Sequence, residues 1–239
     1  MHNMSLESSI TTATRRGAFF WLLLGLLVFG AWQPARATIL VSDDFPTNGT
    51  LAGSTPAVGG IWTSISGTAN ETTVVNGYAL LSDVYGEDLE SGFASTNSGS
   101  LFLGFDLIVS DPGAYTGTDF EYFIHFSGST FSARTDIAAF SASGFRPGIA
   151  TTSSTAEAVW PVDLAYGTSH RIVIRFDFST GLVSLWVDPS ALCDSHIIST
   201  TAVTELTIDA VNLRQMGSTP TLSLRIGRLR VATTFDEAR

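Results

Sequence analysis

The chain has 239 residues and a formal net charge of -10, and charged residues make up 14% of it, against a usual share of ~25%. The chain has no lysine, so its cationic side chains are all arginine. An acidic chain of this kind lacks the positive surface with which proteins bind nucleic acids and anionic lipids. The single cysteine excludes an intramolecular disulfide and a zinc site built from several cysteines.

The N-terminal segment has the three parts of a secretory signal. Arg15 and Arg16 give a positive start, an apolar run of ~15 residues extends from Ala18 to Trp32, and Ala-Arg-Ala at residues 35–37 has the small-x-small pattern of a cleavage site. The apolar run is shorter than the ~20 residues that cross the hydrocarbon of a membrane. We therefore expect a signal-peptide helix that is removed after Ala37.

This reading divides the chain into a signal peptide, residues 1–37, and one exported domain, residues 38–239. The domain is expected to be secreted or to stay in the periplasm or cell envelope, with no membrane attachment after cleavage. The paired arginines also fit a twin-arginine signal, so the export route stays open between the two systems.

From Thr38 onward, period-two alternation replaces helical periodicity. The clearest case is a hairpin over residues 170–188, whose first strand alternates Ile172, Ile174 and Phe176 with polar residues. Gly181 suits the left-handed position of the loop between its two strands. The second strand places Trp186 on the face opposite Val183, Leu185 and Val187, and either set is a candidate for the core.

Other segments read as strands in the same way. Residues 100–110 place a leucine-rich face inward, and residues 119–126 alternate Asp119, Glu121, Phe123 and His125 with an apolar face that includes Tyr122 and Phe126. Further strands are expected at 38–42, 61–65, 72–81, 136–141, 144–149, 156–160, 204–210 and 221–234, and loops at 47–59, 91–98 and 151–155. About a dozen short strands predict an all-β sandwich of two antiparallel sheets.

Several of these segments together resemble the concanavalin A-like (laminin G-like) jelly-roll superfamily, as found in exported bacterial domains. The resemblance rests on segments that span most of residues 38–239: Asp43-Asp44-Phe45, Glu121–Ser127, Phe145–Ile149, Leu164–Pro189 and Leu229–Thr234. It implies a two-sheet antiparallel jelly-roll sandwich. The superfamily contains sugar-binding lectins, glycosidases and polysaccharide lyases, so the resemblance specifies fold better than activity.

Such domains often carry an acidic pair just before the closing strand, where this chain has Gly227 and Arg228. If an acid there holds calcium in relatives, that ligand is missing here. Calcium needs several oxygen ligands, and Asp43, Asp44 and Asp209 remain as candidates, so we predict no cofactor and leave calcium as the alternative.

A glycosidase needs two carboxylic acids a few ångströms apart on either side of the bond that it cleaves. The Glu-x-Asp-x-x-Glu strand motif of the superfamily's glycosidases is absent. The nearest arrangement is Asp119, Glu121 and His125 on one face of one strand, which suits an acid/base pair or the polar exposed face of a half-buried strand.

A sugar-binding sandwich instead places aromatic rings beside hydrogen-bonding groups. The candidate binding residues are Asp119, Glu121, Phe123, His125, Trp160, Arg171, Arg175 and Trp186, with Tyr122 as a further aromatic candidate. Trp62 is expected in the core, and Arg134 and Asp136 are expected to form a surface ion pair. Cys193 is expected in a small buried or loop position, with an intermolecular disulfide as the alternative.

The favoured function is a non-catalytic module that binds a polysaccharide or a cell-surface glycan, as a monomer. The alternatives are a glycan-cleaving hydrolase or lyase that uses Asp119, Glu121 and His125, and a structural protein of the envelope or matrix.

Overall fold

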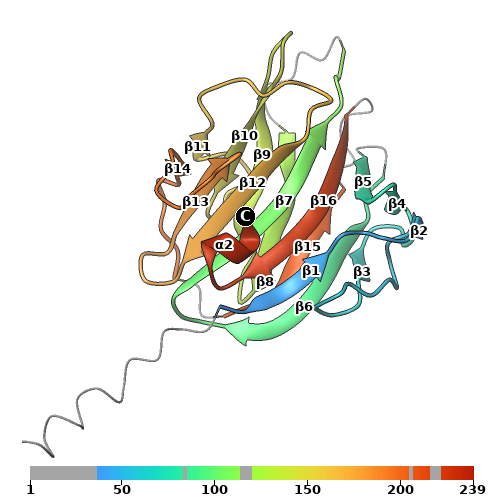
Figure 1. The fold of residues 1–239 in the computed structure, drawn as a ribbon, viewed down its shortest axis with the longest axis horizontal. Helices are drawn as coiled ribbons and strands as arrows, with labels where there is room; N and C mark the ends of the chain where they lie inside the picture. Colours follow the sequence, from blue (N-terminus) through green and yellow to red (C-terminus); the bar gives the residue numbers. More distant parts are fainter. Residues whose placement is uncertain (1–36, 83–84, 114–119, 205–206, 216–221) are drawn as a thin grey trace, which may run out of the picture. The chain divides into compact units, whose positions relative to one another are not determined.

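The computed structural model describes residues 37–82, 85–113, 120–204, 207–215 and 222–239, and this part of the chain consists mainly of strands and turns. Two antiparallel sheets are stacked on each other, as Figure 1 shows. The expected signal peptide, apart from Ala37, lies outside the described residues. No helix in the described ranges is long and apolar enough to cross a membrane.

The larger sheet has nine strands, and segments far apart in the sequence are neighbours in it. Its strands are β1 (Ile39–Asp43), β2 (Gly49–Thr50), β4 (Thr73–Val75), β5 (Tyr78–Ser82), β7 (Ser100–Val109), β12 (His170–Asp177), β13 (Leu182–Val187), β14 (Ile197–Ile198) and β16 (Ser223–Ala232). The order is β14-β13-β12-β7-β16-β5-β4-β2. Along one edge of β16, residues 223–227 pair with β5 and residues 229–232 pair with β1.

The smaller sheet has seven strands and carries the candidate site described below. Its strands are β3 (Thr63–Ser66), β6 (Asp88–Thr96), β8 (Phe120–Gly128), β9 (Ser132–Phe140), β10 (Phe145–Ala150), β11 (Ala158–Val159) and β15 (Ile208–Arg214). The order is β11-β10-β9-β8-β15-β6-β3, so β6, β15, β8 and β9 lie next to one another at its centre.

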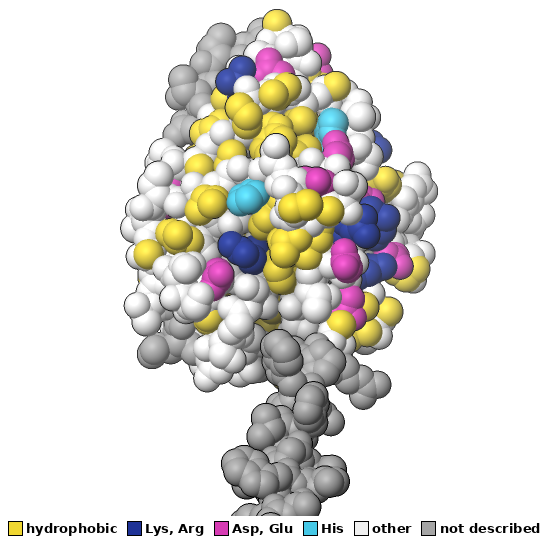
Figure 2. Space-filling model, turned by 60° about the vertical axis from the view of Figure 1, so that its left-hand side comes forward, with side chains coloured by type: hydrophobic (Ala, Val, Ile, Leu, Met, Phe, Trp, Pro, Cys, Tyr) yellow, Lys and Arg dark blue, Asp and Glu magenta, His cyan; other side chains and the backbone are white. Residues whose placement is uncertain are grey.

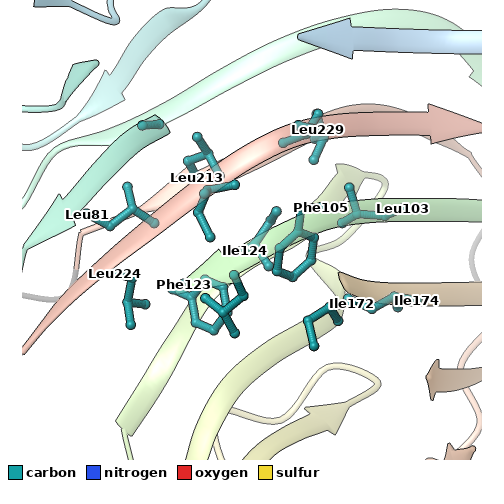
Figure 3. Packing of buried hydrophobic residues seen from close by; sticks show 14 of the residues in the cluster. Leu81, Leu103, Phe105, Phe123, Ile124, Ile172, Ile174, Leu213, Leu224 and Leu229 are labelled. Carbon is teal, nitrogen blue, oxygen red and sulfur yellow. The ribbon is translucent and has the colours of Figure 1, made fainter. Parts of the chain in front are cut away.

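The main core lies between the two sheets. The alternating leucine-rich face of β7 is buried there as predicted, and so are Ile172, Ile174 and Phe176 of β12 and the predicted core residue Trp62. Figure 3 shows side chains of both sheets in this core, with Phe123 and Ile124 of β8 close to Phe105 of β7. Removal of this apolar surface from water is the main favourable term in folding.

The hairpin predicted at residues 170–188 is confirmed as β12 and β13. Arg175 pairs with Ser184 and Phe176 with Val183, and Gly181 has a φ of 69°, the left-handed conformation that the loop was expected to need. Both faces of β13 are buried, because Val183 and Leu185 enter the main core while Trp186 enters a second cluster on the other side.

The second cluster covers the outer face of the nine-stranded sheet. The C-terminal helix α2 (Phe235–Ala238) lies across β7 and β16, as Figure 1 shows, and Phe235 meets Phe102 edge to face at 6.0 Å between ring centroids. The members of the cluster are Phe102, Val173, Trp186, Ala232, Phe235 and Ala238. The sequence did not indicate that this outer face is sealed by the chain's own C-terminal segment.

Two expectations about strands are wrong. Residues 72–81 are not one strand but the hairpin of β4 and β5, because Asn76 and Gly77 adopt left-handed φ values of 51° and 84°, which a two-residue hairpin turn requires. The expected loop at residues 91–98 is largely β6, which pairs with β15 and β3 despite its many small residues.

The predicted alternation of β8 is also wrong, because the strand contains irregularities. Between the pairs Phe120–Ile137 and Ile124–Thr135, β8 has two more residues than β9. This extra length turns Phe123 into the core beside Ile124, while Tyr122 and His125 contact each other with 5.3 Å between ring centroids. The side chains of Phe120 and Glu121 lie outside what the structure describes.

Candidate functional site

Those of the eight predicted binding residues that the structure describes do not come together in one place. Asp119 and the side chain of Glu121 lie outside the described residues, and Phe123 is a fully buried core residue that contacts Phe105 at 6.0 Å between ring centroids. Trp160 follows the edge strand β11 and packs, partly buried, against the main core.

Arg171 and Trp186 lie on the opposite side of the molecule, where the structure gives them packing roles. Arg171 donates hydrogen bonds to the carboxylate of Asp106 at 3.2 Å, to the carbonyl oxygen of Arg228 at 2.7 Å and to that of Ala238 in α2. Burial lowers the pKa of Arg171 to about 10, and the charge of Asp106 acts in the opposite direction. Trp186 is 1% exposed and meets Phe235 edge to face. Neither side chain offers a free surface to a ligand.

Arg175 lies on the same outer face of β12, half-buried beside Trp186. Its guanidinium carbon is 5.9 Å from the Trp186 ring centroid, and it forms a 3.9 Å ion pair with Asp177. Arg171, Arg175 and Trp186 are therefore separated by the whole sandwich from His125 and Tyr122, which lie on the outer face of the other sheet.

Two of the three calcium candidates are engaged in other contacts, and the third, Asp209, is exposed on β15. The carboxylate of Asp43 accepts hydrogen bonds from the backbone nitrogen of Phe45 at 2.7 Å and from Trp62 Nε1 at 2.8 Å. Asp44 forms an ion pair with Arg230 at 2.7 Å. Within the described ranges, no group of three or more histidine, cysteine or acidic side chains is arranged to hold a metal ion.

A polar and aromatic cluster occupies the outer face at the centre of the seven-stranded sheet. Val211 and Leu213 of β15 point into the core. Side chains alternate between the two faces of a strand, so Asn212 and Arg214 point outward. Asn212 pairs with His125 of β8 on one side and with Glu90 of β6 on the other. The cross-strand register therefore places Glu90, Asn212 and His125 in one row across three strands.

Tyr122 joins two arginines from the strands on either side of it. The guanidinium carbon of Arg134 on β9 lies 4.4 Å from the Tyr122 ring centroid, and that of Arg214 on β15 lies 4.5 Å from it. A guanidinium over an aromatic ring is attracted to the ring's negative face. Tyr122 is thus a positioning residue that holds two positive charges on one patch of the sheet.

The arrangement corrects the expectation for Arg134. It was predicted to form a surface ion pair with Asp136, but its contact in the described structure is the Tyr122 ring. One extra residue in β9 between Ser132 and Thr135, with Ala133 at a φ of 52°, breaks the regular alternation just before Arg134. A bulge of this kind re-aims the side chains beside it.

His125 is held neutral beneath the aromatic rings. It is 3% exposed, its Nδ1 lies 3.0 Å from the Phe126 carbonyl oxygen, and its ring contacts both Tyr122 and Phe131. Burial lowers the pKa of His125 to about 4; the hydrogen bond to Phe126 opposes this, and the charges of Arg134 and Arg214 add to it. A neutral ring that donates through Nδ1 keeps Nε2 as an acceptor.

Phe131 supplies the exposed aromatic surface of the cluster. It precedes β9, is 42% exposed and lies tilted against His125 with 4.8 Å between ring centroids. Next to His125, the side-chain amide of Asn212 donates to Glu90 at 3.3 Å, and Asn212 Oδ1 is buried without a hydrogen-bond partner among the described residues. We call Tyr122, His125, Phe131, Arg134, Asn212 and Arg214 the outer-face cluster.

The outer-face cluster combines an exposed ring with cationic donors, an amide and a neighbouring carboxylate. Such a set can hold a polyhydroxylated ligand, because the ring covers apolar C–H groups while the polar side chains exchange hydrogen bonds with hydroxyls. Sequence reasoning found His125 and Tyr122 but missed Phe131, Arg134, Asn212 and Arg214. The only available signal was the concentration of aromatic and basic residues around β8 and β9, and it does not reveal which side chains turn outward.

The opposite side of the molecule carries an apolar hollow instead. Figure 2 turns the β13 and β14 side forward and shows hydrophobic side chains gathered in the middle of that face, with charged side chains around them. A hollow of ≈ 550 Å³ lies between the loop after β13 and α2, lined by Ala191, Leu192, Cys193, Thr234, Phe235 and Asp236. Cys193 is an exposed free thiol in that loop. The hollow offers too few polar groups to hold the hydroxyls of a sugar.

Comparison with known proteins identifies the fold. The structure is similar to that of peanut lectin, solved with a nine-residue peptide, with a TM-score of 0.52 at 12% sequence identity over 83% of this chain and 97% of the lectin. The Lotus tetragonolobus seed lectin gives a TM-score of 0.50 at 11% identity over 78% of this chain and 98% of that one. No protein-family model matches the chain, and no curated protein matches it. The two-sheet antiparallel jelly-roll sandwich predicted from the sequence is confirmed as a fold that this chain shares with these lectins.

Proposed function

We propose that this protein is an exported, non-catalytic carbohydrate-binding module that holds a glycan against the outer face of its seven-stranded sheet. Two observations support this: the fold is shared with two lectins, and the outer-face cluster exposes an aromatic ring beside polar groups. The signal pattern of residues 1–37 supports export to the periplasm, the envelope or the medium, and a mature N-terminus at Thr38 is the result that tests this part.

Phe131 is the observation that carries the proposal. A single exposed apolar side chain is common on protein surfaces, but the Phe131 ring, 42% exposed, lies against the polar and aromatic groups of the outer-face cluster, and that combination points to a ligand. The C–H groups of a sugar ring can cover it. Phe131 contacts His125, His125 contacts Tyr122, and Tyr122 contacts Arg134 and Arg214, so these polar side chains are the ones that we propose bind the hydroxyls.

The hydrolase or lyase alternative needs Asp119 and Glu121 beside His125. Asp119 and the Glu121 side chain lie outside the described residues, and no observation in the described ranges favours cleavage over binding. The third alternative, a structural protein of the envelope, would leave the outer-face cluster without a ligand.

The test is a glycan array probed with the purified protein, followed by titration of the best ligand with two variants. Phe131→Ala removes the exposed ring of the cluster and is expected to weaken binding about tenfold or more, as for the central aromatic of a binding site. Leu192→Ala removes a similarly exposed apolar side chain, 46% exposed, from the opposite hollow and is expected to bind normally. Uniform silence on the array, or equal binding by both variants, contradicts the proposal.

A further inference from the structure

Arg134 differs from the other arginines of the described structure that are buried or half-buried. Each of the others faces a carboxylate at a nitrogen–oxygen distance of 3.9 Å or less. These pairs are Arg146–Asp163, Arg171–Asp106, Arg175–Asp177, Arg214–Asp88 and Arg230–Asp44. Arg134 makes no ion pair and donates no hydrogen bond to another described residue. Its Nε is buried without a partner, as are those of Arg171 and Arg175, so the absent carboxylate is what distinguishes it.

Among the described residues, this guanidinium has no carboxylate partner of the kind that its chemistry favours. Burial of a cation without a compensating anion is unfavourable, and the Tyr122 ring compensates only in part. Arg214, whose guanidinium lies over the same ring, is paired with Asp88. Arg134 therefore brings to the cluster a positive charge that no carboxylate of the described residues offsets at ion-pair distance.

His125 lies beside Tyr122, the residue whose ring both arginines contact. Its pKa is lowered mainly by burial, but the charges of both Arg134 and Arg214 also contribute in that direction. Because His125 stays neutral, its Nε2 can accept a hydrogen bond from a hydroxyl. A neutral His125 also does not compete with Arg134 for an anion. The patch thus offers an aromatic surface, a neutral acceptor and an unpaired planar cation together.

We propose that the glycan bound at the outer-face cluster is acidic, and that Arg134 binds the carboxylate of a uronic-acid residue while Phe131 covers the face of a sugar ring. The fork of a guanidinium matches the two oxygens of a carboxylate, which gives both charge compensation and geometric selection. This inference rests on the proposed carbohydrate-binding function and adds the chemical class of the ligand.

The experiment compares matched glycans that differ only in charge. Oligomers of galacturonate, glucuronate and mannuronate are titrated against the protein beside their carboxyl-reduced, neutral counterparts and beside a sulfated neutral oligomer. The wild type is expected to bind one of the uronates about tenfold or more tightly than its reduced counterpart, because a hydrogen bond to a charged group is worth a factor of at least that order.

Two variants locate the preference. Arg134→Gln is expected to bind the uronate and its reduced counterpart within about threefold of each other, while Arg225→Gln, which removes an exposed arginine from the nine-stranded sheet, keeps the wild-type preference. Near-ultraviolet circular dichroism of both variants verifies that they are folded.

The outcomes separate this inference from the function on which it rests. If the wild type binds reduced and acidic oligomers equally and Phe131→Ala abolishes both, the carbohydrate-binding function stands and the acidic preference is refuted. Tighter binding of the sulfated oligomer than of any uronate, or a preference that survives in Arg134→Gln, also refutes the carboxylate assignment. If no glycan binds at all, both proposals fail.

Discussion

The two outer faces of the sandwich are completed in opposite ways. On the nine-stranded sheet, α2 covers the aromatic cluster, Arg171 joins β12 to Asp106 and to the α2 backbone, and the Trp186 indole donates to the Asp194 carbonyl oxygen at 3.2 Å. On the seven-stranded sheet, Phe131 remains 42% exposed and Arg134 has no acidic partner among the described residues.

The comparison shows why residues of the same type have different roles. Arginine and aromatic residues occur on both faces, but on one face the chain's own C-terminal segment supplies the acceptors and the apolar cover. On the other face, Arg134 has no carboxylate at ion-pair distance among the described residues, whereas Arg171 and Arg175 each face one. A ligand with an anionic group can supply that missing partner and cover the exposed Phe131 ring.

Removal of Arg171 should give the largest effect. Arg171→Ala leaves two backbone carbonyls without their donor and the carboxylate of Asp106 with Arg228 alone, so the free energy of unfolding should fall by about 3 kcal/mol. The matched control is Arg175→Ala on the same strand and face, whose single 3.9 Å ion pair should contribute less than about 1 kcal/mol. Urea unfolding at pH 7 measures both, and equal losses would refute the structural role assigned to Arg171.

Acidification should affect the other face through His125. Its pKa is lowered to about 4 in the folded protein, so between pH 6.5 and 4 the unfolded chain binds a proton that the folded protein does not. Stability from this group is complete above pH 6.5 and is lost as the pH falls, by about 2 kcal/mol between pH 7 and pH 5.

The comparison of wild type with His125→Gln isolates this contribution, because glutamine does not titrate. Urea unfolding of both proteins at pH 7 and pH 5 should show a larger loss in the wild type. An identical pH dependence in the two proteins would mean that His125 is not held neutral under Tyr122 and Phe131.

The sequence predicts the buried faces of the regular strands in the nine-stranded sheet, but it does not predict which side chains of the bulged strands form the outer-face cluster. The strands β7, β12 and β13 alternate without interruption, so their buried faces follow from the pattern alone. In β8 and β9, extra residues interrupt the alternation, and these bulges decide that Phe123 turns inward and Tyr122 outward. A bulge depends on the pairing of two strands, which a pattern within one strand does not contain.

The assignment of Arg134 depended on contacts across strands for the same reason. Its neighbour in the sequence, Asp136, suggested an ion pair, whereas the partner in the structure is the Tyr122 ring on the adjacent strand. The Asn76-Gly77 turn is a different case, because Asn-Gly is a strong hairpin signal and the division of residues 72–81 was readable from the sequence.

The central claim is that the seven-stranded face binds ligand and the nine-stranded face does not. The most direct measurement is a nuclear magnetic resonance titration of the ¹⁵N-labelled protein with the best-bound oligouronate of the matched panel. The account predicts shifts at Phe131, Arg134 and Asn212 and in their neighbours on β8, β9 and β15, with the indole signal of Trp186 and the amides of α2 unchanged. Shifts confined to α2, Trp186 and the loop around Cys193 would contradict it.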